Sequence, residues 1–117
     1  TVAPLEPHSI ASIRNTFKEI LKKADQLVSS WNGKLYFVYL PQRGVVDNEY
    51  HPAGEDALRT ATELGISIVD IHKEVFTAHP DPSLLFSYIG PGHYNAKGYR
   101  LVAEAIAKRI RADSVLQ

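Results

Sequence analysis

Hydrophobic residues recur every three or four positions through the first third of the chain, with charged residues between them. This period predicts a long amphipathic helix. Ser9 is its predicted N-cap, and Asn32-Gly33 is predicted to end it. The apolar positions are Ile10, Ile13, Phe17, Ile20, Leu21, Ala24, Leu27, Val28 and Trp31.

Two short apolar runs, residues 35–40 and 66–71, are predicted to be β-strands. Each run is apolar on both faces, which is typical of strands in a parallel sheet that is covered by helices. Residues 54–64 between them predict a shorter helix that Gly65 closes. Strand, helix and strand in this order form a βαβ unit, for which we expect a right-handed crossover.

The last third of the chain contains a predicted short helix at residues 73–78, a Pro-rich loop at 79–92 and an amphipathic helix at 95–111. Residues 84–89 are a further strand candidate within the loop. The residues of the final helix that are predicted to point inward are Leu101, Val102, Ala105, Ile106 and Ile110.

Two strands are too few for a stable open sheet. We therefore predict an α/β fold that is part of a three-layer α/β/α, flavodoxin-like arrangement, with a parallel sheet and flanking helices. Residues 1–117 are expected to form a single domain that is the carboxy-terminal part of a larger one. The remaining strands are expected from a missing N-terminal segment or from another copy of the chain, as a homo-oligomer.

Composition excludes several functional classes. Lys and Arg number 13, as do Asp and Glu, so no field of one sign attracts nucleic acid. The absence of cysteine removes disulfides, thiolate metal sites and thiol nucleophiles. No apolar run approaches the roughly 20 residues of a membrane span. The histidines His51, His72 and His79 lack metal-ligand spacing, so neither a metal nor a cofactor is predicted.

The start of the chain, Thr1-Val2-Ala3-Pro4, has neither an initiator Met nor a charged-then-apolar leader. We expect it to be a cut or processed end. The cellular location is left open by these features.

A histidine in a turn just before the final helix is the strongest candidate for chemistry. Residues 90–95 are Gly-Pro-Gly-His-Tyr-Asn, in which rigid backbone positions His93 while its ring stays reachable. This is what a general base requires. The alternative is that His93 is a capping residue whose ring packs on the edge of the sheet. Sites in open parallel sheets form at the carboxyl ends of the strands, which here carry Pro41, Gln42 and Arg43 and then Asp70 and His72.

Residues 92–106, Gly-His-Tyr-Asn-Ala-Lys-Gly-Tyr-Arg-Leu-Val-Ala-Glu-Ala-Ile, resemble the final block of the SGNH hydrolases, also called GDSL-like lipases or acylhydrolases. In that block a histidine precedes an Asn and a Gly and opens the last helix. The order of long helix, strand, helix and strand before it is also similar to the later half of that fold. The resemblance covers most of this chain but about half of a family domain.

The resemblance implies ester hydrolysis or acyl transfer by a Ser-His-Asp triad, with His93 as the catalytic base. The substrate would be an acyl ester or an acylated carbohydrate. The family's Gly-Asp-Ser block and its oxyanion-hole blocks do not occur in these residues. The nucleophilic serine is therefore expected outside this chain, and the chain alone is predicted to be inactive.

The family's aspartate normally stands three residues before the histidine, where this chain has Gly90. Asp81 and Asp70 are the nearest acids in sequence that could replace it. The alternative function is a non-catalytic α/β binding or assembly module that has lost the triad.

The remaining polar residues near the motif favour structural roles. Asn95 is predicted to cap the final helix, and Gly98 to allow close packing against a neighbouring element. Asp70 and Asp81 are predicted to anchor turns. Ser87 lies close to His93 in sequence but in no strand-to-helix elbow, so it is not the predicted nucleophile.

Overall fold

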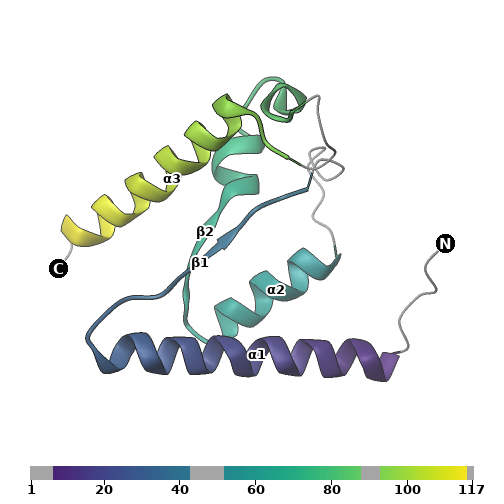
Figure 1. Ribbon diagram of the computed structural model, residues 1–117, viewed down its shortest axis with the longest axis vertical. Coiled ribbons are helices and arrows are strands. Elements are labelled where there is room, and N and C mark those ends of the chain that lie inside the picture. Colours follow the sequence, from purple (N-terminus) through teal and green to yellow (C-terminus); the bar gives the residue numbers. More distant parts are fainter. Residues whose placement is uncertain (1–6, 43–51, 88–92, 116–117) are drawn as a thin grey trace. The chain divides into compact units, whose positions relative to one another are not determined.

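The computed structural model describes residues 7–42, 52–87 and 93–115 (Figure 1). Their order is helix α1 (Pro7–Ser30), strand β1 (Tyr36–Tyr39), helix α2 (Pro52–Glu63), strand β2 (Ser67–Asp70), π-helix η2 (His72–Phe76), 3₁₀-helix η3 (Pro82–Leu85) and helix α3 (Ala96–Val115). The two strands form a small parallel sheet. The predicted α/β class is therefore confirmed at this coarse level.

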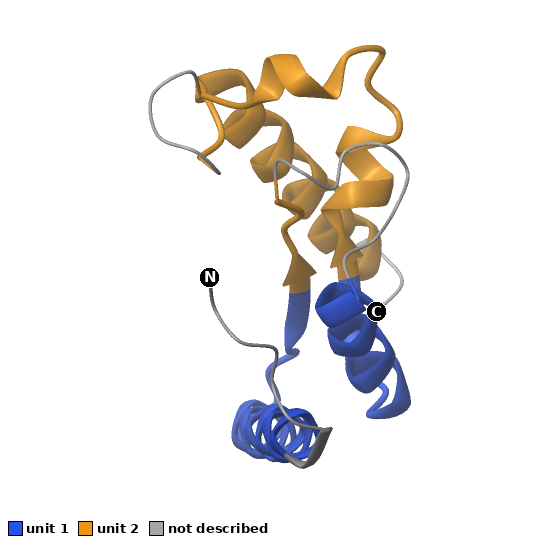
Figure 2. Ribbon diagram, turned by 90° about the vertical axis from the view of Figure 1, so that its right-hand side faces the viewer, with its two compact units in different colours: residues 1–37, 52–68 blue, residues 38–51, 69–117 orange. Residues whose placement is uncertain are grey.

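The chain divides into two compact units, which Figure 2 distinguishes by colour. Residues 1–37 and 52–68 make the first unit, which holds α1 and α2. Residues 38–51 and 69–117 make the second, which holds η2, η3 and α3. The candidate residue His93 belongs to the second unit.

Both predicted C-terminal stops of the first unit's helices are confirmed. After α1, Asn32 takes the left-handed conformation, with φ 59°, and the Gly33 N–H bonds the Val28 carbonyl at 2.8 Å. After α2, Gly65 has φ 72° and the Ile66 N–H bonds the Ala61 carbonyl at 3.0 Å. Each is the 6→1 bond of a Schellman motif, which satisfies carbonyls that a helix end leaves open.

The predicted start of α1 is wrong by three residues, because an N-cap at Ser9 would make Ile10 the first helical residue, whereas the helix begins at Pro7. Proline is favoured in the first helical turn, where its fixed φ fits and its missing N–H has no intrahelical partner to lose. A serine two residues inside the helix therefore does not act as the cap.

A small apolar core holds the first unit together. Leu21 of α1, Ala61 of α2 and Ile66 are buried, and partly buried side chains surround them. The rings of Phe17 and Phe37 meet edge to face, with centroids 5.9 Å apart. The helices α1 and α2 lie side by side, and the Arg14 guanidinium bonds the Asp56 carboxylate at 2.7 Å. The partly buried residues are Phe17, Leu35, Phe37, Leu64 and Ile68.

The burial of the strands differs from the prediction. All four residues of β1 are only half-buried, and in β2 Val69 alone is buried. The two described strands form the whole described sheet, so the apolar faces that suggested central strands are incompletely covered. The further strand candidate at 84–89 is also not a strand where it is described, because Leu84 and Leu85 belong to η3 and Phe86 makes a single bridge to Tyr94.

Helix α3 shows its predicted amphipathic character except near its end. Val102 is buried, and Leu101, Ala105 and Ile106 are half-buried. Ile110 was expected to point inward but is 45 % exposed. None of the described helices combines the length and hydropathy of a membrane span.

Candidate functional site

His93 lies on a short antiparallel pairing directly before α3. The Ser87 N–H donates to the His93 carbonyl at 2.8 Å, and the neighbouring residues Phe86 and Tyr94 form a β-bridge. Successive residues of an extended segment point to opposite sides. Tyr94 is accordingly buried, whereas His93 is exposed. The backbone of His93 is thus held while its ring is reachable from solvent.

Asn95 is the N-cap of α3, as predicted. Its Oδ1 accepts the Gly98 backbone N–H at 2.9 Å, which satisfies one of the donors left open in the first turn. Its Nδ2 donates to the Leu84 carbonyl at 2.6 Å, and its backbone N–H donates to the Leu85 carbonyl at 2.9 Å. Asn95 therefore fixes the start of α3 and also ties it to η3.

Gly98 permits the close approach that the sequence suggested. A Cβ atom at this position would collide with the Leu85 backbone carbonyl and press on the Tyr94 side chain. A backbone atom in a paired segment has little freedom to move aside. Glycine lowers the helix propensity at this position, but its lack of a Cβ atom allows α3 to pack directly against the end of η3.

Tyr94 connects the histidine segment to the end of β1. Its Oη donates to the Pro41 carbonyl at 2.6 Å across 53 positions of sequence, and both residues are buried. Its ring packs on Phe76 and Phe86, with centroids 5.4 and 5.2 Å away. Pro41 follows β1, and Phe76 lies in the helix that follows β2. His93 is consequently adjacent to a residue anchored at the carboxyl ends of the strands.

Burial raises the pKa of the Tyr94 hydroxyl above its ordinary value, and the nearby Tyr39 and Tyr99 add to this shift. The raised pKa keeps the hydroxyl protonated, so it remains a donor to Pro41. Sequence reasoning did not identify Tyr94 as important for the site. The available signal was that a buried tyrosine hydroxyl requires a partner, but the partner itself lies too far along the chain to be inferred.

We predict that Tyr94→Phe lowers the free energy of unfolding by about 1–3 kcal/mol, because the buried Pro41 carbonyl loses its donor while the packing of the ring is kept. The raised pKa adds a pH signature. Above pH ~10 the unfolded chain releases the Tyr94 proton and the folded chain retains it, so stability falls with rising pH. Urea unfolding at neutral and alkaline pH measures this effect. The free energy of unfolding should fall less steeply with pH in Tyr94→Phe than in the unchanged protein. An equally steep fall in both proteins would contradict the raised pKa of Tyr94.

The two candidate acids have local roles, as predicted. Asp81 Oδ1 accepts the Ser83 hydroxyl at 2.6 Å, and Asp70 Oδ1 accepts the Lys73 backbone N–H at 3.3 Å. Within the described residues, the His93 ring has no hydrogen-bond or ion-pair partner. The orienting carboxylate of a triad is therefore not supplied by the part of the chain that the structure describes.

Other sequence candidates are placed as follows. His72 is buried, at 1 % exposure, so its ring is not a surface group. His79 accepts the Asp81 backbone N–H on its Nδ1 at 3.0 Å. The described residues contain no group of three His, Asp or Glu side chains that is suited to a metal ion. The candidates that lie outside the described residues are Arg43, His51, Gly90, Pro91 and Gly92.

Comparisons with protein-family models, with curated proteins and with solved structures found no match to this chain.

Proposed function

We propose that this chain carries the catalytic-base histidine, His93, of an SGNH-type ester hydrolase or O-acyltransferase. The observation that carries the proposal is the bond between Tyr94 and Pro41, because it anchors the neighbour of His93 at the carboxyl end of β1. Sites of open parallel sheets form at that edge. The resemblance of residues 92–106 to the last SGNH block points to the same role for His93.

The proposal includes the fold of the parent domain. The parallel pair β1 and β2, connected through α2, would be part of a larger three-layer α/β/α, flavodoxin-like sheet. Half-buried apolar strands support this extension, since strands with apolar residues on both faces are typical of sheets covered by helices on both sides.

In the proposed reaction, His93 accepts the proton of a serine hydroxyl as the serine oxygen attacks the carbonyl carbon of an acyl ester or acylated carbohydrate. The histidine then gives this proton to the departing alcohol, and an acyl-serine remains. Water or an acceptor hydroxyl attacks the acyl-serine in the same manner, with His93 again as base. The serine and the oxyanion hole would lie outside these residues.

The test is His93→Ala in a protein that joins these residues to the serine block, with hydrolysis of p-nitrophenyl acetate as the measurement. Loss of turnover in a folded variant would support the proposed role. Unchanged turnover would overturn it.

The alternative, a binding or assembly module without activity, is favoured by Gly90, which stands where the family has its aspartate. The variant Gly90→Asp separates the two functions. If the rest of the site is intact, a restored carboxylate should raise turnover severalfold or more, since loss of a triad aspartate can cost about ten-thousandfold. No gain in Gly90→Asp, together with no effect of His93→Ala, would favour the alternative.

A further inference from the structure

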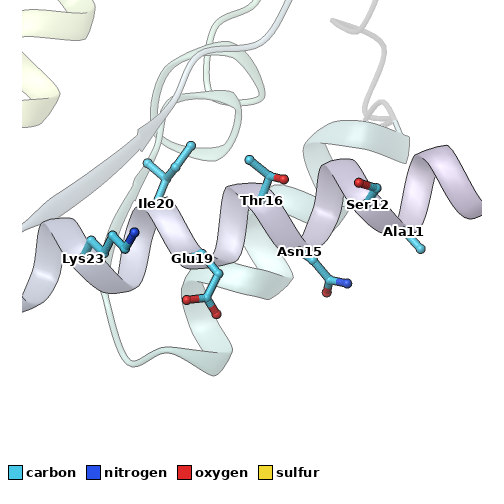
Figure 3. Close-up of a pocket in the computed structure, with 7 residues that line it drawn as sticks. All are labelled: Ala11, Ser12, Asn15, Thr16, Glu19, Ile20 and Lys23. Atoms are coloured by element: carbon cyan, nitrogen blue, oxygen red, sulfur yellow. The ribbon is translucent and has the colours of Figure 1, made fainter.

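A shallow groove runs along α1 in the first unit. Figure 3 shows that every residue lining it comes from this one helix, and all of these residues are exposed. Pockets that bind small molecules enclose most of the surface of the ligand. A one-sided groove of exposed side chains does not enclose a ligand in this way, so the second unit, which holds His93, offers the stronger candidate.

The side chain of Asn95 makes more hydrogen bonds than a helix cap requires. An N-cap needs one acceptor for a backbone N–H of the first turn, and Ser or Asp supplies it as well as Asn does. Asn95 meets this need through Oδ1, which accepts the Gly98 N–H at 2.9 Å. Its Nδ2 also donates to the carbonyls of Leu84 and Phe86, at 2.6 and 3.3 Å. A serine or an aspartate lacks this pair of donors, so the two additional bonds point to a second role for Asn95.

The additional bonds act on the segment that pairs with His93. The Asn95 Nδ2 bonds the residues on both sides of Leu85, and the Asn95 backbone N–H donates to the Leu85 carbonyl itself at 2.9 Å. Asn95 thus engages three successive carbonyls. The residue that follows them, Ser87, donates its N–H to the His93 carbonyl at 2.8 Å. Asn95 therefore fixes the segment to which the backbone of His93 is bonded.

The direction of the His93 ring depends on this backbone. The ring is exposed, and among the residues that the structure describes it has no hydrogen-bond or ion-pair partner. The position of its own Cα and its rotamer then set where the ring reaches. Tyr94 ties the next residue of the chain to Pro41, and Asn95 holds the paired segment. A change at Asn95 is therefore expected to move the ring without touching it.

We propose that Asn95 is a positioning residue for His93, and that it acts through the two donor bonds of its Nδ2 rather than through its helix cap. This inference rests on the proposed function, in which His93 is the general base. A general base has to lie within hydrogen-bond reach of the proton that it accepts, and a displacement of about 1 Å can cost about a hundredfold in rate. Because both ends of the Asn95 amide bond the protein itself, Asn95 contributes to turnover rather than to substrate binding.

The variants Asn95→Ser and Asn95→Ala separate the donor bonds from the cap. Serine keeps an N-cap acceptor but has no amide donor, whereas alanine has neither. In a protein that joins these residues to the serine block, both variants should lower kcat by about tenfold to a hundredfold and leave KM unchanged. A purely structural role would lower the urea midpoint and leave kcat of the folded enzyme unchanged. Unchanged kcat in Asn95→Ser, or a loss confined to Asn95→Ala, would overturn the proposal.

Thr77→Ala is the matched control. The Thr77 hydroxyl donates to the Lys73 carbonyl at 2.8 Å, so this variant also removes a bond from a side chain to the backbone in the second unit. That bond lies at the end of η2 and not in the segment paired with His93. Thr77→Ala should keep full kcat, and an equal loss in Thr77→Ala and Asn95→Ser would contradict a specific role for Asn95.

Amide hydrogen exchange on the 117-residue chain tests the geometry without any catalytic activity. The Ser87 N–H should exchange about threefold to tenfold faster in Asn95→Ser, the range expected for the loss of one hydrogen bond. The Thr77 N–H, which donates to the His72 carbonyl at 2.9 Å, should exchange at the same rate in both chains. Equally slow exchange at Ser87 in both chains would rule out the positioning role.

The kinetic results distinguish this inference from the proposed function. If His93→Ala keeps full turnover, the role of His93 as general base is wrong, and the positioning role of Asn95 is wrong with it. If His93→Ala loses turnover and Asn95→Ser keeps it, the positioning role alone is wrong. Loss of kcat in both variants, with an unchanged KM in Asn95→Ser and faster exchange at Ser87, is the expected result.

Discussion

Replacement of His93 by alanine is expected to lower ester hydrolysis by at least a hundredfold in a protein that contains these residues and the serine block. A positioned general base contributes about 10²–10⁴ in rate, and a hundredfold loss corresponds to about 2.7 kcal/mol of transition-state stabilisation. The loss should appear in kcat as well as kcat/KM, because a general base at His93, as proposed, would act on the reacting proton rather than on binding. The side chain is exposed and has no partner among the described residues, so its removal should leave the fold unchanged.

His79→Ala is the matched control for this experiment. It removes a histidine from the same unit and costs one exposed hydrogen bond to the Asp81 backbone. His72 is unsuitable as a control, because its buried ring would leave a cavity when truncated. Equal losses in His93→Ala and His79→Ala, with both variants folded, would contradict a specific role for His93.

The elements that local sequence determines were predicted well. Periodicity located α1, α2 and α3, and the stops at Asn32-Gly33 and Gly65 follow from the left-handed conformation that Asn and Gly tolerate. The cap at Asn95 was also predictable from local sequence, because its bond to Gly98 spans a single helical turn. Each of these features depends on residues within a few positions of one another.

Features that depend on distant contacts were not predictable. The bond from Tyr94 to Pro41 places the histidine at the strand ends, and no local pattern specifies its partner. The exposure of Ile13 and Leu27 was also missed, because helical period shows which residues share a face but not what covers that face. The role of Gly98 was predictable only in part. A glycine within a helix suggested a close neighbour, but it did not identify that neighbour as Leu85.

Truncation of Phe76 to alanine is expected to cost about 3–5 kcal/mol of unfolding free energy, the usual range for a buried phenylalanine. Phe76 is fully buried, and its ring stacks on Phe86 and packs against Tyr94, both at 5.4 Å between centroids. Because native domains are stable by about 5–15 kcal/mol, this loss is a large fraction of the total. Urea unfolding followed by far-ultraviolet circular dichroism measures it.

Tyr99→Ala separates burial from mere membership of the same aromatic cluster. Tyr99 also contacts the Tyr94 ring, at 5.6 Å, but it is 56 % exposed. Its truncation leaves no closed cavity, so we expect a loss within about 1 kcal/mol. A loss for Tyr99→Ala as large as that for Phe76→Ala would contradict the placement of Phe76 at the centre of the cluster.

Phe76 supports the Tyr94 ring, whose hydroxyl bonds Pro41. Phe76→Ala should therefore also loosen the backbone of His93. Faster amide hydrogen exchange at Ser87, whose N–H donates to the His93 carbonyl, would reveal this change.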